Sequence, residues 1–303
     1  MTERILIFFA LAGLGWAFRK GGLLTRDGVR DLIRLNMDVC VPALTFVTAA
    51  TRLTPAVAAL DAGIAGPLLG LPLAAILLTL ASVAIGFATV PLAGVSRRRT
   101  PTYVFILTFA NALFLPIPLA FALRGEDGVL FVNLFYAGYL VLFWTLGTWL
   151  LSGKVRWGFF LHPNLFALVL GAWVGMAGWT VPGPLLDILK IVAGGAIGLA
   201  LIYSGAVLGE ERLSFARDAR ALAVLAGVKL VVFPLLALLA VRAVAAPGPI
   251  AFQAVLQAAM PCMAQAGLYV DRFGGDTGFA SRAAVLTSLL CLVTVPFFLG
   301  QTG

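Results

Sequence analysis

The chain consists of long apolar runs separated by short clusters of charged residues, proline and glycine. A helix needs about 20 apolar residues to cross a bilayer. Reading the runs between the clusters predicts ten membrane-spanning helices. They cover residues 4–18, 31–51, 66–92, 101–123, 128–151, 164–179, 185–208, 219–242, 250–270 and 278–300. The composition agrees, because 61% hydrophobic and 11% charged residues exclude an ordinary soluble domain.

The distribution of charge predicts the orientation of these spans. When the loops are assigned alternately, 15 of the 21 Lys and Arg residues fall on one side and five on the other. Positively charged loops face the cytoplasm, so we predict a multi-pass protein of the inner (plasma) membrane, with both termini on the outer side. The net charge of +8 follows from this topology, and basic residues in short loops indicate no nucleic-acid partner.

The fourth predicted span contains residues that interrupt a membrane helix. Pro116 and Pro118 lack an N–H group, so the carbonyls of Ala112 and Phe114 lose their helical partners. Free backbone groups at membrane depth are tolerated only inside protein or beside water. A simple proline kink is the other interpretation. Together with Asn111, this segment predicts a broken helix that faces a ligand.

The ninth predicted span has a similar pattern. Pro261 frees the carbonyl of Gln257, and Gln257 and Gln265 lie four residues to either side of it. Ten spans divide into five and five, and an odd number per half requires an inverted repeat, as in many secondary transporters. We therefore predict an all-α integral membrane protein with two inverted five-helix repeats, residues 1–151 and 152–303. Its two broken helices would cross and turn partially positive half-helix N-termini toward an anion.

Two ionisable residues lie well inside predicted spans. Lys229, halfway along the eighth span, would attract an anion or act as a mobile counter-charge, or else form a structural ion pair or extend to the interface. Asp38 would pair with Arg34, or serve as a proton or cation site or as the partner of Lys229. Asn36 and Thr45 are weaker candidates, typical of interhelical hydrogen bonding.

No catalytic or metal-binding motif is found in the sequence. The three cysteines have no CxxC or metal-ligand spacing, which predicts buried free thiols. The chain contains no HExxH, no P-loop and no GxSG, and its single histidine, His162, lies in a predicted loop. We predict that the protein is not an enzyme and uses no cofactor or metal.

Several segments, in this order and spacing, resemble the auxin efflux carrier family across nearly the full length. They are GWAFRKGGLLTRDGVRDLIRLNMDVCVPALTF, FANALFLPIP followed by RGEDG, HPNLFALVLG, GLALIYSGAVLG, VKLVVFP and MPCMAQAGLYVDRFGGD. The resemblance implies a fold related to sodium/bile-acid symporters and a homodimer embedded in membrane lipid. It also implies a scaffold formed by the first, second, sixth and seventh spans and a mobile transport domain formed by the others.

The resemblance also implies a small organic anion as substrate, moved by an elevator-type shift and bound where the fourth and ninth spans cross. Carried over by position, the site includes Asn111, Pro116 and Pro261, to which the adjacent Ala112, Phe114, Gln257 and Gln265 are added. Pro116 stands where relatives tend to have glycine. The predicted crossing contains no carboxylate, which favours sodium-independent transport. A sodium-coupled symporter and a channel-like or ligand-sensing membrane module are the alternatives.

Overall fold

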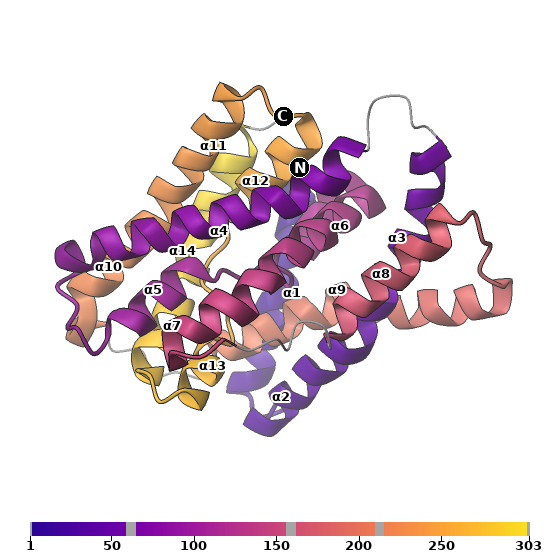
Figure 1. Cartoon of the computed structure of the whole chain (residues 1–303). Coiled ribbons are helices and arrows are strands. Elements are labelled where there is room, and N and C mark those ends of the chain that lie inside the picture. Colours follow the sequence, from indigo (N-terminus) through magenta and orange to yellow (C-terminus); the bar gives the residue numbers. More distant parts are fainter. Residues whose placement is uncertain (1, 59–64, 156–161, 210–214, 302–303) are drawn as a thin grey trace. The chain divides into compact units, whose positions relative to one another are not determined.

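The computed structural model describes residues 2–58, 65–155, 162–209 and 215–301 (Figure 1). Apart from a single-residue bridge, the regular structure in these ranges is helical. The elements are α1 (Thr2–Lys20), α2 (Arg26–Leu35), η1 (Asn36–Cys40), α3 (Val41–Ala58), α4 (Ala65–Ala93), α5 (Thr100–Thr108), α6 (Pro116–Leu142), η2 (Phe143–Gly147), α7 (Thr148–Ser152), α8 (Pro163–Met176), α9 (Gly183–Leu208), η4 (Ala216–Asp218), α10 (Ala219–Gly227), η5 (Val228–Val232), α11 (Phe233–Ala243), α12 (Gly248–Ala258), α13 (Ala266–Arg272) and α14 (Thr277–Leu299). The all-helical prediction is confirmed.

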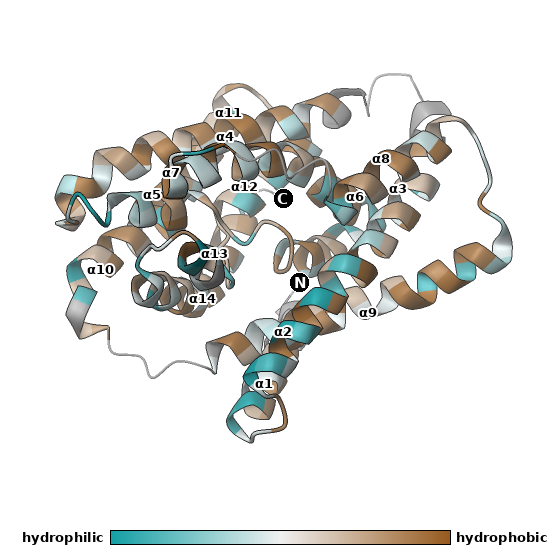
Figure 2. Cartoon of the chain, turned by 60° about the horizontal axis from the view of Figure 1, so that its bottom comes forward, coloured by the Kyte–Doolittle hydropathy of each residue, from teal (hydrophilic) through white to brown (hydrophobic). Residues whose placement is uncertain are grey.

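Several helical segments are long and apolar enough to cross a membrane. Within the described ranges six qualify: Arg26–Leu53, Leu69–Ala93, Pro116–Ser152, Gly183–Val207, Ala219–Ala243 and Thr277–Leu299. Pro116–Ser152 joins two helices across Gly125, whose backbone is not helical. Figure 2 shows the contrast along the chain, with mostly brown and pale ribbon in α4 and teal bands in α2. The protein is therefore a multi-pass membrane protein. The layout of ten spans in two inverted repeats stays a prediction, and Arg156 and Arg212, which entered the charge argument, lie outside the described residues.

Local sequence explains where the second predicted span begins. The helical run starts at Arg26, earlier than predicted, because the Thr25 hydroxyl accepts a hydrogen bond of 3.0 Å from the Gly28 N–H and caps the helix. Asp27 in the first turn adds a favourable charge. Hydrophobic periodicity alone cannot place this start, because the first turn is polar.

Two helices widen into a π-turn just before a proline. In η1 the Val41 N–H bonds to the Asn36 carbonyl, and in η5 the Phe233 N–H bonds to the Val228 carbonyl. Pro42 and Pro234 follow directly. A proline cannot donate to the carbonyl four residues earlier and crowds it, so a wider turn relieves the clash. Each π-turn contains one of the two ionisable residues chosen from the sequence, Asp38 and Lys229.

Contacts divide the chain into two compact units, and each draws on both halves of the sequence. Unit 1 comprises Met1–Leu68, Leu113–Leu134 and Gly158–Glu210, and unit 2 comprises Leu69–Ala112, Phe135–Trp157 and Glu211–Gly303. In unit 2, aromatic side chains from α5, the segment after it, α6, η2 and α13 form a buried cluster in which ring centres of Phe109 and Phe143 lie 5.3 Å apart. Phe109 belongs to the segment that follows α5, so this cluster anchors that segment to the helices around it.

Glycines let the helices of unit 1 approach closely. A Cβ atom at Gly15 of α1 would collide with the carbonyl of Ile202 in α9, and one at Gly205 of α9 would collide with the carbonyl of Ala12. Gly171 of α8 lies in the same way against the backbone of α3. Lipid tails are as apolar as the side chains, so the hydrophobic effect does not drive helices together in a membrane. Their association depends on close van der Waals packing instead.

A buried polar network joins three helices of unit 1. The Thr45 hydroxyl of α3 lies 2.8 Å from Oδ1 of Asn133 in α6 and 2.6 Å from Oδ1 of Asn164 in α8. Asn164 Nδ2 donates to Asn133 Oδ1 at 3.0 Å, and Asn133 Nδ2 donates to the Val129 carbonyl. The prediction that Thr45 bonds between helices is confirmed. The sequence does not predict that Asn133 and Asn164 take part, because nothing in one sequence shows that they meet.

We expect Thr45→Val to lower the free energy of unfolding by about 1–2 kcal/mol, since it keeps the side-chain volume but leaves buried amide oxygens with fewer donors. The control is Thr51→Val on the same helix, whose hydroxyl bonds only to the Val47 carbonyl of its own helix, at 2.8 Å. Thermal unfolding of the purified variants checks the ranking. Equal losses in both variants would show that the network does not stabilise the unit.

Candidate binding site

Both predicted breaks are present as complete interruptions of a helix. Helix α5 ends at Thr108 and α6 begins at Pro116, whereas α12 ends at Ala258 and α13 begins at Ala266. The interruptions are residues 109–115 and 259–265. Pro116 is the first residue of its helix, where the missing N–H costs nothing. The alternative of a simple kink in the fourth span is therefore wrong.

The two interruptions pair with each other inside unit 2. Ala110 and Cys262 form an antiparallel bridge, and the Asn111 N–H donates to the Pro261 carbonyl at 2.9 Å. At membrane depth an unpaired backbone group costs several kcal/mol, so this pairing replaces part of what the helices lose.

Side chains from neighbouring helices bind further backbone groups of the interruptions. The Tyr139 hydroxyl of α6 donates to the Ala110 carbonyl at 2.9 Å, and Gln257 Nε2 of α12 donates to the Ala112 carbonyl at 3.1 Å. The Cys262 N–H donates to the Thr287 hydroxyl of α14 at 3.1 Å. The carbonyl of Ala112, predicted to be available to a ligand, thus already accepts one hydrogen bond, although its second lone pair is left.

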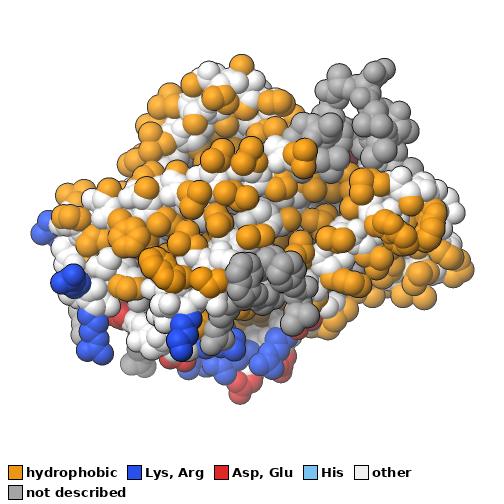
Figure 3. Space-filling model, in the orientation of Figure 1, with side chains coloured by type: hydrophobic (Ala, Val, Ile, Leu, Met, Phe, Trp, Pro, Cys, Tyr) orange, Lys and Arg blue, Asp and Glu red, His pale blue; other side chains and the backbone are white. Residues whose placement is uncertain are grey.

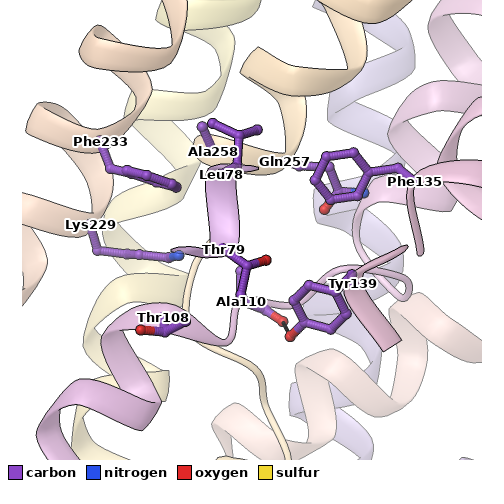
Figure 4. Close-up of a pocket in the computed structure, with 10 residues that line it drawn as sticks. All are labelled: Leu78, Thr79, Thr108, Ala110, Phe135, Tyr139, Lys229, Phe233, Gln257 and Ala258. Atoms are coloured by element: carbon purple, nitrogen blue, oxygen red, sulfur yellow. Dashed lines mark hydrogen bonds between the residues drawn. The ribbon is translucent and has the colours of Figure 1, made fainter. Parts of the chain in front are cut away.

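A small cavity lies beside the paired segments, within unit 2 (Figure 4). Its volume is about 20 Å³, which suits about one water molecule. The lining residues come from α4, α5, α6, η5, α11, α12 and the first interruption. They are Leu78, Thr79, Thr108, Ala110, Phe135, Tyr139, Lys229, Phe233, Gln257 and Ala258.

Lys229 is the only charged residue among those ten. Its side chain is 1% exposed, and Figure 4 shows it reaching in from η5 toward the centre of the group. Its Nζ lies 5.3 Å from the centre of the Phe233 ring, which is cation–π distance. Among the described residues no ion pair involves Lys229. A buried ammonium without a carboxylate must be stabilised by neutral groups.

Several buried polar atoms near the interruptions have no hydrogen-bond partner in the part of the chain that the structure describes. They include Thr108 Oγ1 and Gln257 Oε1, on two residues that line the cavity, and Gln265 Nε2 at the start of α13. Gln265 is 9% exposed and does not line the cavity. Unpartnered polar atoms are rare inside proteins, and several in one region are typical of a site that receives a ligand or water.

Sequence comparisons point in one direction. A family model described as membrane transport protein matches residues 1–155 and 147–299. The chain belongs to this membrane transport protein family. An uncharacterized transporter of Methanothermobacter thermautotrophicus is 25% identical over 305 residues, a match that covers 98% of this chain and 97% of the relative. The resemblance to auxin efflux carriers is thereby confirmed, and membership of this transport family favours transport over catalysis.

In this family member, the predicted site residues fall into two groups. Asn111, Ala112, Gln257, Pro261 and Gln265 belong to unit 2, as does Lys229, and the backbone or side chains of the first four bond across the interruptions. Phe114 and Pro116 belong to unit 1, where the Phe114 ring packs edge-on against Tyr203 at 4.9 Å. Sequence reasoning did not single out Thr79, Thr108, Tyr139 or Thr287, whose roles depend on contacts distant in sequence.

Asp38 belongs to η1 of unit 1, whereas the residues that line the cavity belong to unit 2. Its side chain is exposed, because the neighbouring positions Asn36 and Cys40 take the buried face of the turn. No ion pair joins it to Arg34 in the described part of the chain. Its charge acts on His162, whose pKa is lowered by burial and partly raised by Asp38. Its roles as a cation site or as the partner of Lys229 stay predictions. The three cysteines are free and buried, as predicted.

A cluster of buried and half-buried ion pairs lies at one end of unit 2. Arg99 bonds to Asp218 and to Asp276, each at 2.7 Å, and Arg282 forms a very short bond with Asp218. Asp276 also caps α14 by accepting from the Phe279 N–H at 2.9 Å. These residues precede or lie in α5, α10 and α14, so the starts of these three helices lie close together. Blue side chains gather there in Figure 3, where α4 ends and α5 begins.

The charge of Asp218 depends on its two arginine partners. Burial alone raises the pKa of Asp218, but the hydrogen bonds and charges of Arg282 and Arg99 outweigh it, so the pKa lies below its ordinary value of 3.8. A depressed pKa means that the ionised group stabilises the fold above pH 3.8, and that this stability is lost as the pH falls through the folded-state pKa.

We expect Asp218→Asn to lower the free energy of unfolding at pH 7 by about 1–3 kcal/mol, since it weakens two charged hydrogen bonds. Asp27→Asn is the control, because Asp27 pairs with Arg30 on the surface, where such pairs contribute little. Thermal unfolding across pH checks the sign. The difference between wild type and Asp218→Asn should shrink below about pH 3.8. A difference that grows there would contradict the assignment.

Proposed function

We propose that this protein is a secondary carrier that moves a small organic anion across the inner membrane by elevator-type alternating access. The observation that carries the proposal is Lys229. It is a basic residue, buried with no carboxylate beside it among the described residues, next to two interrupted helices of a transport-family protein. Ionisable residues at membrane depth are costly and generally mark a substrate or ion pathway. A lone positive charge there attracts anions rather than cations.

The substrate carboxylate would bind at the interruptions. Gln265 offers an Nε2 donor without a partner, and Asn111 lies where the two segments pair. Gln257 is less suited to a carboxylate, since its Nε2 already donates to Ala112 and its Oε1 can only accept. The cavity of about 20 Å³ is much smaller than the roughly 300 Å³ of a typical small-molecule site, so substrate binding requires the unit to open locally. A site that opens and closes is what alternating access needs.

The two compact units support the idea of a scaffold and a moving domain. Unit 2 contains α4, α5, α10–α14 and the cavity, and unit 1 contains α1–α3, α8 and α9. This division resembles the proposed transport domain and scaffold, apart from the shared fourth and fifth spans. We further propose a homodimer with both termini on the outer side, on the basis of the family resemblance and the charge distribution.

Asn111→Ala and Gln265→Ala should each weaken binding of the substrate at least tenfold, because each removes a polar partner of a carboxylate that has left water. Binding is measured as thermal stabilisation of the purified protein across a panel of mono- and dicarboxylates. A ligand at a hundred times its Kd adds about 2.7 kcal/mol to a two-state equilibrium. The exposed Gln301→Ala is the control, and unchanged affinity in both site variants would overturn the site.

Transport should not require sodium, since no carboxylate lines the cavity. Uptake of the best-binding carboxylate into proteoliposomes should be equal with sodium and with choline outside. A carrier saturates at a low turnover, so single-channel currents would instead favour a channel. Uptake that stops without a sodium gradient would favour a sodium-coupled symporter.

A further inference from the structure

The neutral groups around the cavity of unit 2 present oxygen lone pairs rather than protons. The Tyr139 hydroxyl proton is committed to the Ala110 carbonyl, and Gln257 Nε2 is committed to the Ala112 carbonyl. What they leave toward the cavity is the Tyr139 oxygen, the second lone pair of Ala110 and the unpartnered Gln257 Oε1. An oxygen-rich lining of this kind suits a small cation.

Two hydroxyls complete the lining. Thr79 of α4 is 5% exposed and Thr108 of α5 is 4% exposed, and Thr108 Oγ1 has no hydrogen-bond partner. A threonine hydroxyl can turn its lone pairs toward a positive charge. Neutral oxygens from five different segments therefore surround a volume of about 20 Å³. Hard monovalent and divalent cations are bound by such oxygens, usually with a carboxylate added.

Lys229 supplies the positive charge for this lining from within the chain. Its ammonium has three protons and no acceptor, and the π-turn η5 directs the side chain inward (Figure 4). The Phe233 ring, 5.3 Å from Nζ, adds a negative face on one side. The small cavity has space for about one water molecule, but no space for a second cation.

We propose that the Lys229 ammonium is a tethered cation. It occupies a monovalent-cation site made by Thr79, Thr108, the Ala110 carbonyl, Tyr139 and Gln257, and it replaces a dissolved coupling ion. The role of the ammonium in transport rests on the proposed carrier function, whereas the geometry of the cation site does not. Lys229 then polarises the interruptions without touching the substrate. In the competing arrangement, Lys229 binds the substrate carboxylate directly, and the experiment separates the two.

The test removes the ammonium and offers cations in its place. Lys229→Ala enlarges the cavity and exposes the oxygens, whereas Lys229→Met removes the charge but fills most of the volume. The purified variants are titrated with methylammonium, ammonium, sodium and choline chlorides at constant ionic strength, without substrate, and thermal stability is measured. The exposed Lys190→Ala is the control for loss of a lysine.

We expect methylammonium, ammonium or sodium, but not choline, to raise the melting temperature of Lys229→Ala by several degrees. Wild type, Lys229→Met and Lys190→Ala should not respond. If Lys229→Ala responds to no cation more strongly than Lys229→Met does, the tethered-cation site is wrong. If cations have no effect but substrate affinity falls in Lys229→Met, the direct-contact arrangement is correct instead. Failure of wild type to bind any carboxylate would overturn the proposed function and leave the cation titration valid.

A second pair of variants keeps the test decisive if Lys229→Ala does not fold. Thr108→Val removes one oxygen at constant volume. It should destabilise wild type, where the ammonium needs that oxygen, and should have no effect in the Lys229→Met background. Equal effects in both backgrounds would show that Thr108 and Lys229 do not interact, which contradicts the proposal.

Discussion

Unit 2 depends on satisfying the backbone groups of two interrupted helices at membrane depth. Water is absent there, so every N–H and C=O that leaves a helix needs a partner from the protein. The two interruptions satisfy part of this need through each other, at Ala110 and Cys262 and between Asn111 and Pro261. Tyr139, Gln257 and Thr287 bond three further backbone groups from three different helices. The interruptions are therefore held in place by hydrogen bonds from neighbouring helices.

This constraint also determines which side chains can bind a ligand. Gln257 and Tyr139 already use their donors on the backbone, so what they offer the cavity is oxygen. Among the described residues, Gln265 Nε2 donates to no backbone carbonyl, so it can donate to a ligand. Residues that look equivalent in sequence, such as two glutamines spaced evenly around Pro261, thus have different chemistry. The difference arises from which of them reaches a freed carbonyl.

The sequence predicts the helices and their breaks well because both follow from local rules. Proline removes a donor wherever it stands, and apolar runs of membrane length form helices in any context. The partners of the broken segments could not be predicted. Tyr139 lies 29 residues and Gln257 145 residues from the carbonyls that they bind, and one sequence contains no record of such contacts. For the same reason Phe114 and Pro116 were grouped with residues of the other unit.

Buried charges of unit 2 are stabilised in different ways. At one end of unit 2, Asp218 is held between Arg99 and Arg282, where partial exposure lowers the cost of gathering charges. Lys229 forms no ion pair among the described residues, and its ammonium lies beside an aromatic face in a neutral lining. A carboxylate beside Lys229 would neutralise it and remove the attraction for an anion. An oxygen lining stabilises the ammonium and leaves its charge in place. A carrier of anions needs a positive charge that is not neutralised, and the neutral lining of the cavity is consistent with that need.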